Sequence, residues 1–231
     1  MSIKPTVATA KPDGRLLRGA ATRERVLDAA ERLFATVGFD GVSIRQIAQE
    51  AGVTLGVVGF HSGSKLELFK TVLRRRVAPL SAARTEALAE IRKNPARRTD
   101  VAALVDAYLA PQIEISLSRD PQWRAYSKLV GQIVHDERWY DLLHELYDAD
   151  AAEYLAALAE ALPATGRERL AAAFFLTVAV VQSTAVSRAR AHALSKGGGS
   201  RSRGGLSNQD MTETLLDFCI GGMERTARTR S

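Results

Sequence analysis

The chain has 231 residues, 46% of them hydrophobic, which is enough apolar material for one large helical unit or two modest domains. No apolar run reaches the roughly 18 to 20 residues that a bilayer span needs, and no signal-peptide hydrophobic region precedes Lys11, so we expect a cytoplasmic protein without a membrane partner. The single cysteine, Cys219, excludes an internal disulfide and a thiolate metal cluster, and we expect it to be a small buried side chain.

The net charge of +6 is concentrated in the first third of the chain. Residues 1–76 contain 13 Lys and Arg against 7 Asp and Glu, whereas residues 77–231 contain 19 of each. This asymmetry indicates an N-terminal surface suited to a polyanion, to which a basic arm would contribute part of the charge.

The first segment, residues 1–20, mixes basic side chains with proline and glycine and has no apolar periodicity, so we predict a flexible basic arm. Two interpretations are open: an unstructured tail, or an arm that follows phosphates or enters the minor groove of DNA. A helix capped by Thr22 and ended by Gly38 should follow, because apolar residues recur at three- and four-residue steps, at Val26, Leu27, Ala30, Leu33, Phe34 and Val37.

Two short helices joined by a tight turn at Gly52 are predicted within residues 43–61. Ser43 and Gln46 have the spacing of a capping box, and Thr54 can cap the second helix, which should run from Leu55 to about residue 60. With the first helix packed against them, this is the layout of a helix-turn-helix, in which the second short helix enters the major groove with its N-terminal residues.

The rest of the chain is also predicted to be helical. A second capping box, Ser64 with Glu67, opens a longer helix that Pro79 should kink or end. Proline and glycine breaks separate further helices, predicted near residues 99–118, 121–134, 138–162, 167–195 and 208–227. Residues 197–205 are glycine-rich and predict a flexible loop, and no strand-like alternation of useful length occurs. The sequence therefore predicts an all-α fold.

An ordered set of short pieces carries a family resemblance: Val-Leu-Asp-Ala-Ala at 26–30, Leu-Phe-Ala at 33–35, Gly-Phe-Asp-Gly at 38–41, Ser-Ile-Arg-Gln-Ile-Ala at 43–48, Ala-Gly-Val-Thr at 51–54, then His61, Ser64 and Lys65. Over residues 22–69 the chain resembles the DNA-binding domain of TetR/AcrR-type regulators. The resemblance implies a basic arm over residues 1–20, a three-helix helix-turn-helix domain over residues 21–68, and a helical ligand-binding and dimerisation domain over residues 69–231.

The resemblance also implies which residues contact DNA. Thr54, at the start of the recognition helix, would bond a phosphate or base edge, and Gly56 would let the backbones approach closely. Lys65 would reach a phosphate from the start of the fourth helix. The full expected set is Ser43, Arg45, Thr54, Leu55, Gly56, Val57, Phe60, His61 and Lys65. For each residue a local role stays open, such as capping by Ser43 alone.

The recognition helix departs from the family pattern at two positions. A tyrosine that would hold a phosphate is replaced by Gly59, and a phenylalanine that would anchor this helix to the fourth is replaced by Ser62. Gly59 also weakens a short helix by about 0.5 to 1 kcal/mol relative to alanine. An alternative function is therefore a helical small-molecule-binding protein with a degenerate DNA-binding domain.

The C-terminal half is expected to bind an effector and to form a homodimer. Helices near residues 170–194 and 211–226 are rich in small side chains and would build a four-helix isologous interface. Aromatic side chains that belong either to the core or to the wall of a cavity for a small apolar or amphipathic effector are Tyr108, Trp123, Tyr126, Trp139, Tyr147, Phe174 and Phe175.

No catalytic or phosphate-binding motif occurs in a convincing context, so we expect neither an enzyme nor a cofactor. Asp141, His144 and Asp148 share one helix face, but a solvated acidic face is the simpler interpretation and no metal site is predicted. The sequence thus predicts a ligand-responsive regulator, by family habit a repressor, that binds a palindromic DNA operator as a dimer.

Overall fold

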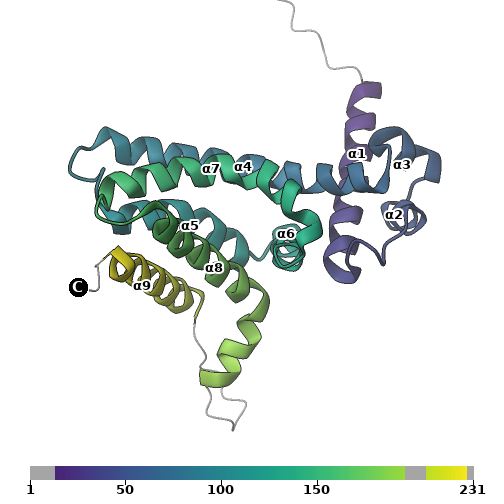
Figure 1. Cartoon of the computed structure of the whole chain (residues 1–231). Helices are drawn as coiled ribbons and strands as arrows, with labels where there is room; N and C mark the ends of the chain where they lie inside the picture. The colour runs from purple at the N-terminus through teal and green to yellow at the C-terminus, as the bar shows by residue number, and fades with distance from the viewer. Residues whose placement is uncertain (1–13, 196–206, 228–231) are drawn as a thin grey trace, which may run out of the picture.

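The computed structural model describes residues 14–195 and 207–227, and the regular secondary structure of these two ranges is helical (Figure 1). The predicted all-α class is confirmed. The α-helices, with one short 3-10 helix η1, are α1 (Gly14–Val37), α2 (Ile44–Ala51), α3 (Leu55–Ser62), α4 (Lys65–Lys93), α5 (Val101–Leu117), α6 (Pro121–Ile133), η1 (Glu137–Trp139), α7 (Tyr140–Ala161), α8 (Arg167–Ser195) and α9 (Asn208–Ala227).

Helix α1 begins earlier than the sequence predicted. The segment up to residue 20 was expected to be irregular, and this is wrong for residues 14–20, which are helical. Thr22 is therefore no cap; its hydroxyl donates to the carbonyl of Arg18, 2.9 Å away and one turn back. Leucine, arginine and alanine in this segment favour a helix, and Gly19 alone costs only about 1 kcal/mol. The rest of the predicted arm, residues 1–13, lies outside the described ranges.

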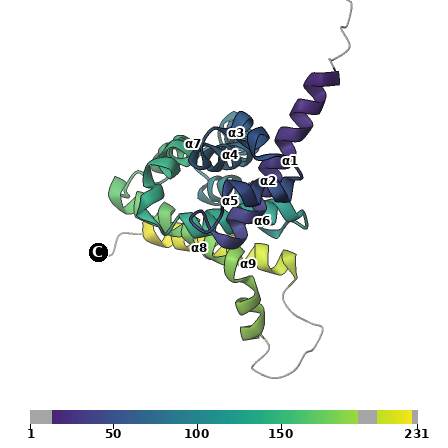
Figure 2. The ribbon, with the colours of Figure 1, turned by 90° about the vertical axis from the view of Figure 1, so that its right-hand side faces the viewer.

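The first three helices and the start of α4 form a compact head at one end of the molecule (Figures 1 and 2). Its core is aromatic: the Phe34 ring meets Phe69 edge-on at 5.0 Å between centroids, and Phe39 meets Phe69 at 5.0 Å. Gly38 and Gly52 end α1 and α2 with positive φ angles of 84° and 63°, a conformation that glycine adopts without strain.

Helix α4 runs from this head along the C-terminal half of the molecule (Figure 1). The Ser64 hydroxyl accepts a bond from the backbone N–H of Glu67, as a helix cap does. The sequence predicted a kink or an end at Pro79, and the predicted end is wrong, because α4 continues to Lys93. The buried side chains of Val77 and Leu80 on either side of the proline hold the helix in the core and offset the backbone hydrogen bond that proline removes.

Helix α6 lies across α1 and joins the head to the rest of the chain (Figure 2). Tyr126, Leu129 and Val130 of α6 belong to the same apolar core as the helix-turn-helix residues. The Gln132 side-chain amide donates to the carbonyl of Ala35 at 3.2 Å, and the Trp139 ring lies 5.0 Å from Phe39. The head is therefore packed firmly onto the C-terminal half and is not an independent domain on a linker.

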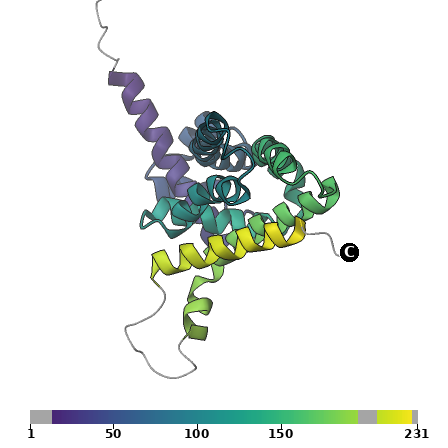
Figure 3. The ribbon, with the colours of Figure 1, turned by 90° about the vertical axis from the view of Figure 1, so that its left-hand side faces the viewer.

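A second core joins α4, α5, α7, α8 and α9, with α5 packed against all four of the others. Figure 3 shows α9 lying along one side of this bundle, beside α8. Both helices have the bounds that the sequence predicted, whereas the predicted glycine-rich loop between them lies in the part that is not described. Among the described helices, none is long and apolar enough to cross a bilayer.

Candidate nucleic-acid interface

Helix α2 begins with the predicted capping box. The Ser43 hydroxyl accepts from the backbone N–H of Gln46 at 3.2 Å, and the Gln46 side-chain oxygen accepts from the backbone N–H of Ser43 at 2.8 Å. The Ser43 hydroxyl also donates to this Gln46 oxygen at 2.8 Å. The exposed Arg45 stands beside this cap and has no ion-pair partner within the described ranges. The start of α2 thus offers one unpaired cation next to a fixed helix N-terminus, an arrangement that favours phosphate.

The start of α3 lies at the protein surface. Thr54 occupies the cap position, but its hydroxyl makes no capping hydrogen bond, so this group remains available to a ligand. The Leu55, Gly56 and Thr54 positions are all exposed, and Val57 is half-buried. A Cβ added at Gly56 would meet no atom within 4 Å, so packing inside the protein does not require glycine there. A glycine on such a surface leaves room for another backbone to approach.

Phe60 is the most conspicuous side chain of α3. It is 85% exposed, an unusual state for phenylalanine, and its ring lies 5.1 Å from the neighbouring His61 ring in an edge-to-face contact. The two rings form a small aromatic pair at the C-terminal end of α3. Such a pair can pack against sugar and phosphate without reading a base.

A buried valine holds α3 in place, and the sequence analysis missed it. Val58 is 1% exposed and belongs to the core of the head, whereas Ser62, where the resemblance led us to expect an anchoring phenylalanine, is only half-buried. Gly59 is exposed, and a Cβ there would meet nothing within 4 Å. The two departures from the family pattern therefore leave α3 intact and docked through Val58.

Lys65 is positioned by the loop between α1 and α2. Its Nζ donates to the carbonyl of Asp40 at 3.4 Å and lies 4.5 Å from the centroid of the Phe39 ring. An ammonium has three N–H groups, so the remaining donors can still bind a phosphate. The lysine starts α4 directly after the α3–α4 turn, on the side of the head that carries α3.

Several of the N-terminal cations are not available for a polyanion. Arg74 donates to Glu145 of α7 at 2.7 Å and 2.9 Å, and Arg32 donates to Glu50 at 3.1 Å. The expected basic surface is correspondingly smaller than the charge count suggested, because charges are paired across helices that are distant in sequence.

Glu31 of α1 is the most deeply buried charge of the head, with no exposed surface. It accepts two bonds from Arg76 of α4, both at 2.8 Å, and one from Arg75 at 2.9 Å. Arg75 also donates to Asp28 at 2.8 Å and to Glu24 at 2.9 Å. The Arg76 guanidinium lies 4.7 Å from the Trp123 ring of α6, so one residue joins three helices. No spacing rule applied to the sequence could pair these residues.

The predicted effector residues separate into three places. Trp123 lines a cavity of about 840 Å³ between α4, α5, α6 and α9. A cavity of about 790 Å³ between α5, α7 and α8 is lined by four of the others, Tyr108, Tyr147, Phe174 and Phe175. Trp139 packs in the core of the head, and Tyr126 is wholly buried with its hydroxyl 2.7 Å from that of Tyr147. Burial raises the pKa of Tyr126 to about 12.

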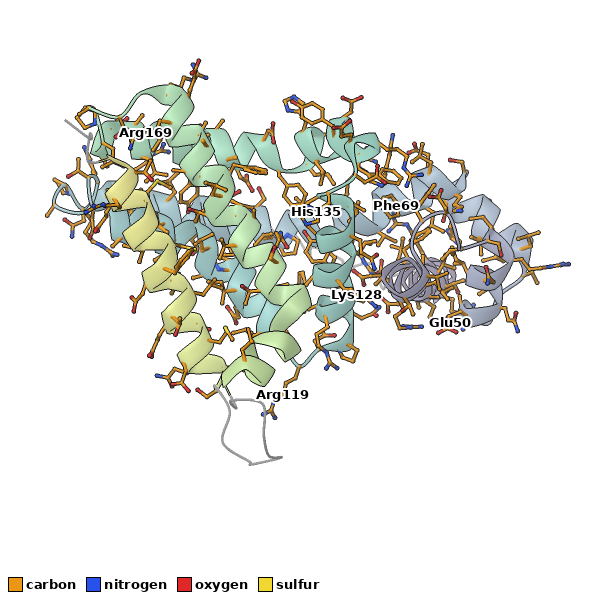
Figure 4. All side chains as sticks on the ribbon, turned by 60° about the horizontal axis from the view of Figure 1, so that its bottom comes forward. Glu50, Phe69, Arg119, Lys128, His135 and Arg169 are labelled. Carbon is orange, nitrogen blue, oxygen red and sulfur yellow. The ribbon has the colours of Figure 1, made fainter. Side chains whose placement is uncertain are left out.

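Helices α8 and α9 carry large exposed apolar side chains. Phe175 and Leu176 of α8 are 68% and 61% exposed, and Phe218 of α9 is 66% exposed. Figure 4 shows the two helices side by side at one edge of the molecule, with Arg169 near one end of α8. Large apolar side chains left exposed on two neighbouring helices are candidates for a surface that associates with another molecule.

Two further groups have simple explanations. Cys219 is buried as predicted, and desolvation raises the pKa of its thiol to about 11. The Nδ1 atom of His144 lies 2.6 Å from the Oδ2 atom of Asp148, so this histidine is paired with a single carboxylate. No group of three or more metal-ligating side chains occurs in the described ranges.

Comparison with known proteins agrees with this architecture. Residues 26–72 match the family model described as bacterial regulatory proteins of the tetR family, and residues 106–222, half of the chain, match the tetracyclin repressor-like C-terminal domain. The transcriptional regulators SrpR and TtgW, both of Pseudomonas putida, are each 40% identical over 91 residues, 39% of this chain. The matched regions span 41% and 66% of these relatives, less than two thirds.

A solved structure shows the same fold over nearly the whole chain. The crystal structure of a transcriptional regulator from Rhodococcus sp. RHA1 superimposes with a TM-score of 0.56, covering 88% of this chain and 96% of that one at 22% identity. Its similarity extends across both the helix-turn-helix and the C-terminal helices.

Proposed function

Because the chain belongs to the TetR family of bacterial regulators, we propose that it represses transcription by binding a palindromic operator as a homodimer and releasing it when an effector binds. The observation that carries this proposal is the α2–α3 surface, where Arg45, Thr54 and Lys65 are presented on a docked and intact helix-turn-helix. Such a surface supports DNA binding over the alternative of a degenerate head. Operator DNA is cytoplasmic in bacteria, so the proposed function also places the chain there.

On this proposal the DNA contacts divide by type. Arg45 and Lys65 bind phosphates and set the register, whereas Thr54 and the exposed start of α3 lie against base edges. Ser43 holds the N-terminus of α2 toward a phosphate, and Phe60 with His61 packs against the backbone. Phosphate contacts of this kind give most of the affinity and make it depend on salt.

The homodimer is proposed to form through the outer faces of α8 and α9. Phe175, Leu176 and Phe218 are exposed in one chain and would be buried by a second copy related by a two-fold axis. The dimer would hold two copies of α3 about 34 to 36 Å apart, one turn of DNA. Phe175, which also lines a cavity, would then belong to the interface.

The effector is proposed to act through the contacts that fix the head. Trp123 faces both a cavity of the C-terminal half and the guanidinium of Arg76, and Arg76 holds Glu31 of α1. Movement of α4 or α6 would therefore reorient α1 and change the spacing of the two α3 helices. By thermodynamic reciprocity, DNA and effector must then weaken each other's binding.

The test is selection of binding sites from a random duplex pool with the full chain, followed by affinity measurements on Arg45→Ala and Lys65→Ala. Each variant should weaken binding similarly on all sequences, whereas Thr54→Ala should relax the preference at one position in each half-site. Lys128→Ala is the matched control, because Lys128 is exposed on α6, away from α3 (Figure 4). A folded protein that enriches no sequence would contradict the proposal.

A further inference from the structure

Arg84 of α4 is more deeply buried than Arg75 and Arg76, the two paired arginines that hold Glu31. Its side chain is only 4% exposed, yet no carboxylate lies within ion-pair distance of it in the described ranges. Arg75 and Arg76, which are more exposed, each pair with at least one carboxylate. A buried guanidinium without a counter-ion is expensive, because the charge has lost its hydration and gained no opposite charge.

The bonds that Arg84 does make leave the donors of both terminal nitrogens unused. Its Nε donates to the carbonyl of Tyr108 at 3.0 Å, and the guanidinium lies 3.8 Å from the centroid of the Tyr108 ring. The Tyr154 hydroxyl donates to the Arg84 backbone carbonyl at 2.7 Å. These contacts fix the orientation of the side chain, and no described residue accepts from the two terminal nitrogens. The guanidinium is thus held rigid with its outer donors free.

Arg84 lines a cavity of about 530 Å³ between α4 and α7, a size typical of small-molecule sites. Leu88, Ala89 and Tyr154 give it apolar walls. The other charged residues that line it are Arg92, Lys93, Arg98, Asp150 and Glu153. Arg92 is paired with Glu153, and Lys93 with Glu90, so their charges are largely neutralised at the rim.

Asp150 contributes a second unpaired group to the same cavity. One of its carboxylate oxygens accepts from the Ser81 hydroxyl at 2.7 Å, whereas the other is enclosed and has no hydrogen-bond partner. Buried polar atoms are normally satisfied, so this oxygen, one of several unsatisfied buried atoms in the described ranges, lacks a donor in a cavity that Arg84 also lines. A molecule that fits both groups would present an acceptor to Arg84 and a donor to Asp150.

From these contacts we infer that the cavity between α4 and α7 binds a small organic anion, whose carboxylate pairs with Arg84 and whose neighbouring hydroxyl or ammonium group donates to Asp150. The apolar walls take a short hydrocarbon or aromatic body. A planar guanidinium binds a carboxylate with two parallel bonds, which gives both affinity and orientation. The site does not involve DNA and is distinct from the cavity that Trp123 lines; that its occupant acts as an effector, through α4, rests on the function proposed above.

The experiment measures binding to the full chain, without DNA, by calorimetry with four probes of one carbon skeleton: 3-phenyllactate, L-phenylalanine, 3-phenylpropionate and uncharged 3-phenylpropan-1-ol. The three carboxylates should bind and the alcohol should not, with the hydroxyl or ammonium compound binding more tightly than 3-phenylpropionate. Equal binding of alcohol and carboxylates, or no binding of any carboxylate at millimolar concentration, would overturn the inference.

Variants then assign the binding to Arg84. Arg84→Met keeps the length and packing of the side chain and should weaken 3-phenylpropionate binding on the order of 10- to 100-fold. Arg74→Gln is the matched control, because it removes one positive charge from α4 outside the cavity and should leave this affinity unchanged. If Arg84→Met does not stay helical by circular dichroism, Arg84→Lys replaces it and should weaken binding less than tenfold but measurably. Unchanged affinity for 3-phenylpropionate in a folded Arg84 variant would contradict the proposed binding site. The effect of the probes on DNA affinity is measured separately, because it tests the proposed function and not the binding site.

Discussion

Glu31→Gln removes the buried negative charge that joins α1 to α4, and it is the strictest test of how these helices of the head are held together. The Glu31 carboxylate has no exposed surface and accepts three bonds of 2.8 to 2.9 Å from Arg75 and Arg76. In Glu31→Gln the side chain keeps its size, but Arg76 loses the carboxylate that it holds with two bonds. Arg75 keeps Asp28 and Glu24, so one guanidinium, not two, is left without a partner.

The expected loss follows from that difference. Removing one partner of a buried ion pair costs about 3 to 5 kcal/mol when the remaining charge is uncompensated. Arg76 is only partly buried and keeps its contact with the Trp123 ring, so we expect a loss below this range, about 2 to 3 kcal/mol. That is a large part of the roughly 5 to 15 kcal/mol by which a domain is stable.

Urea unfolding followed by circular dichroism measures the free energy of unfolding directly, and the slope with urea shows whether the unfolded state has changed. The matched control is Glu50→Gln, which breaks the exposed pair with Arg32 and should cost less than about 1 kcal/mol. Equal losses in the two variants would refute the argument that burial makes the Glu31 contacts strong.

Three other predictions concern single residues. Gly59→Ala should raise the free energy of unfolding by about 0.5 to 1 kcal/mol, because the added Cβ meets nothing within 4 Å and glycine is unfavourable inside a helix. Urea unfolding measures this change, and a lower free energy of unfolding in the variant would show that α3 is not helical at this position. Because burial raises the pKa of Cys219 to about 11, the folded protein at pH 8 should react with a thiol reagent far more slowly than the unfolded chain, and equal rates would contradict the burial. Phe218→Asp should shift the proposed dimer toward monomer in sedimentation without loss of helix, and an unchanged dimer would move the interface elsewhere.

Periodicity and capping signals predicted the helices well, because these signals are local. The Ser43–Gln46 box, the Gly52 turn and the bounds of α8 and α9 all depend on residues a few positions apart. The start of α1 was missed because Gly14 and Gly19 were interpreted as breakers, although the leucines and arginines between them favour a helix.

The contacts between helices could not be predicted in this way. Glu31 with Arg76, and Arg84 with Tyr108, join residues 45 and 24 positions apart, and their pairing depends on how the helices cross. The same limit applies to the aromatic residues: only the packing decides that Trp139 belongs to the core of the head and Trp123 to a cavity wall. Single-sequence patterns contain no information on such crossings.

The central claim is that the exposed α2–α3 surface binds duplex DNA specifically. The most direct measurement is the affinity of the full chain for its selected operator and for an unrelated duplex over a series of salt concentrations. We predict tight, specific binding, with an association constant whose logarithm falls steeply with the logarithm of the salt concentration, and a slope about 1 shallower for Lys65→Ala. A folded dimer with no affinity for either duplex at low salt would contradict it and favour the degenerate-head alternative.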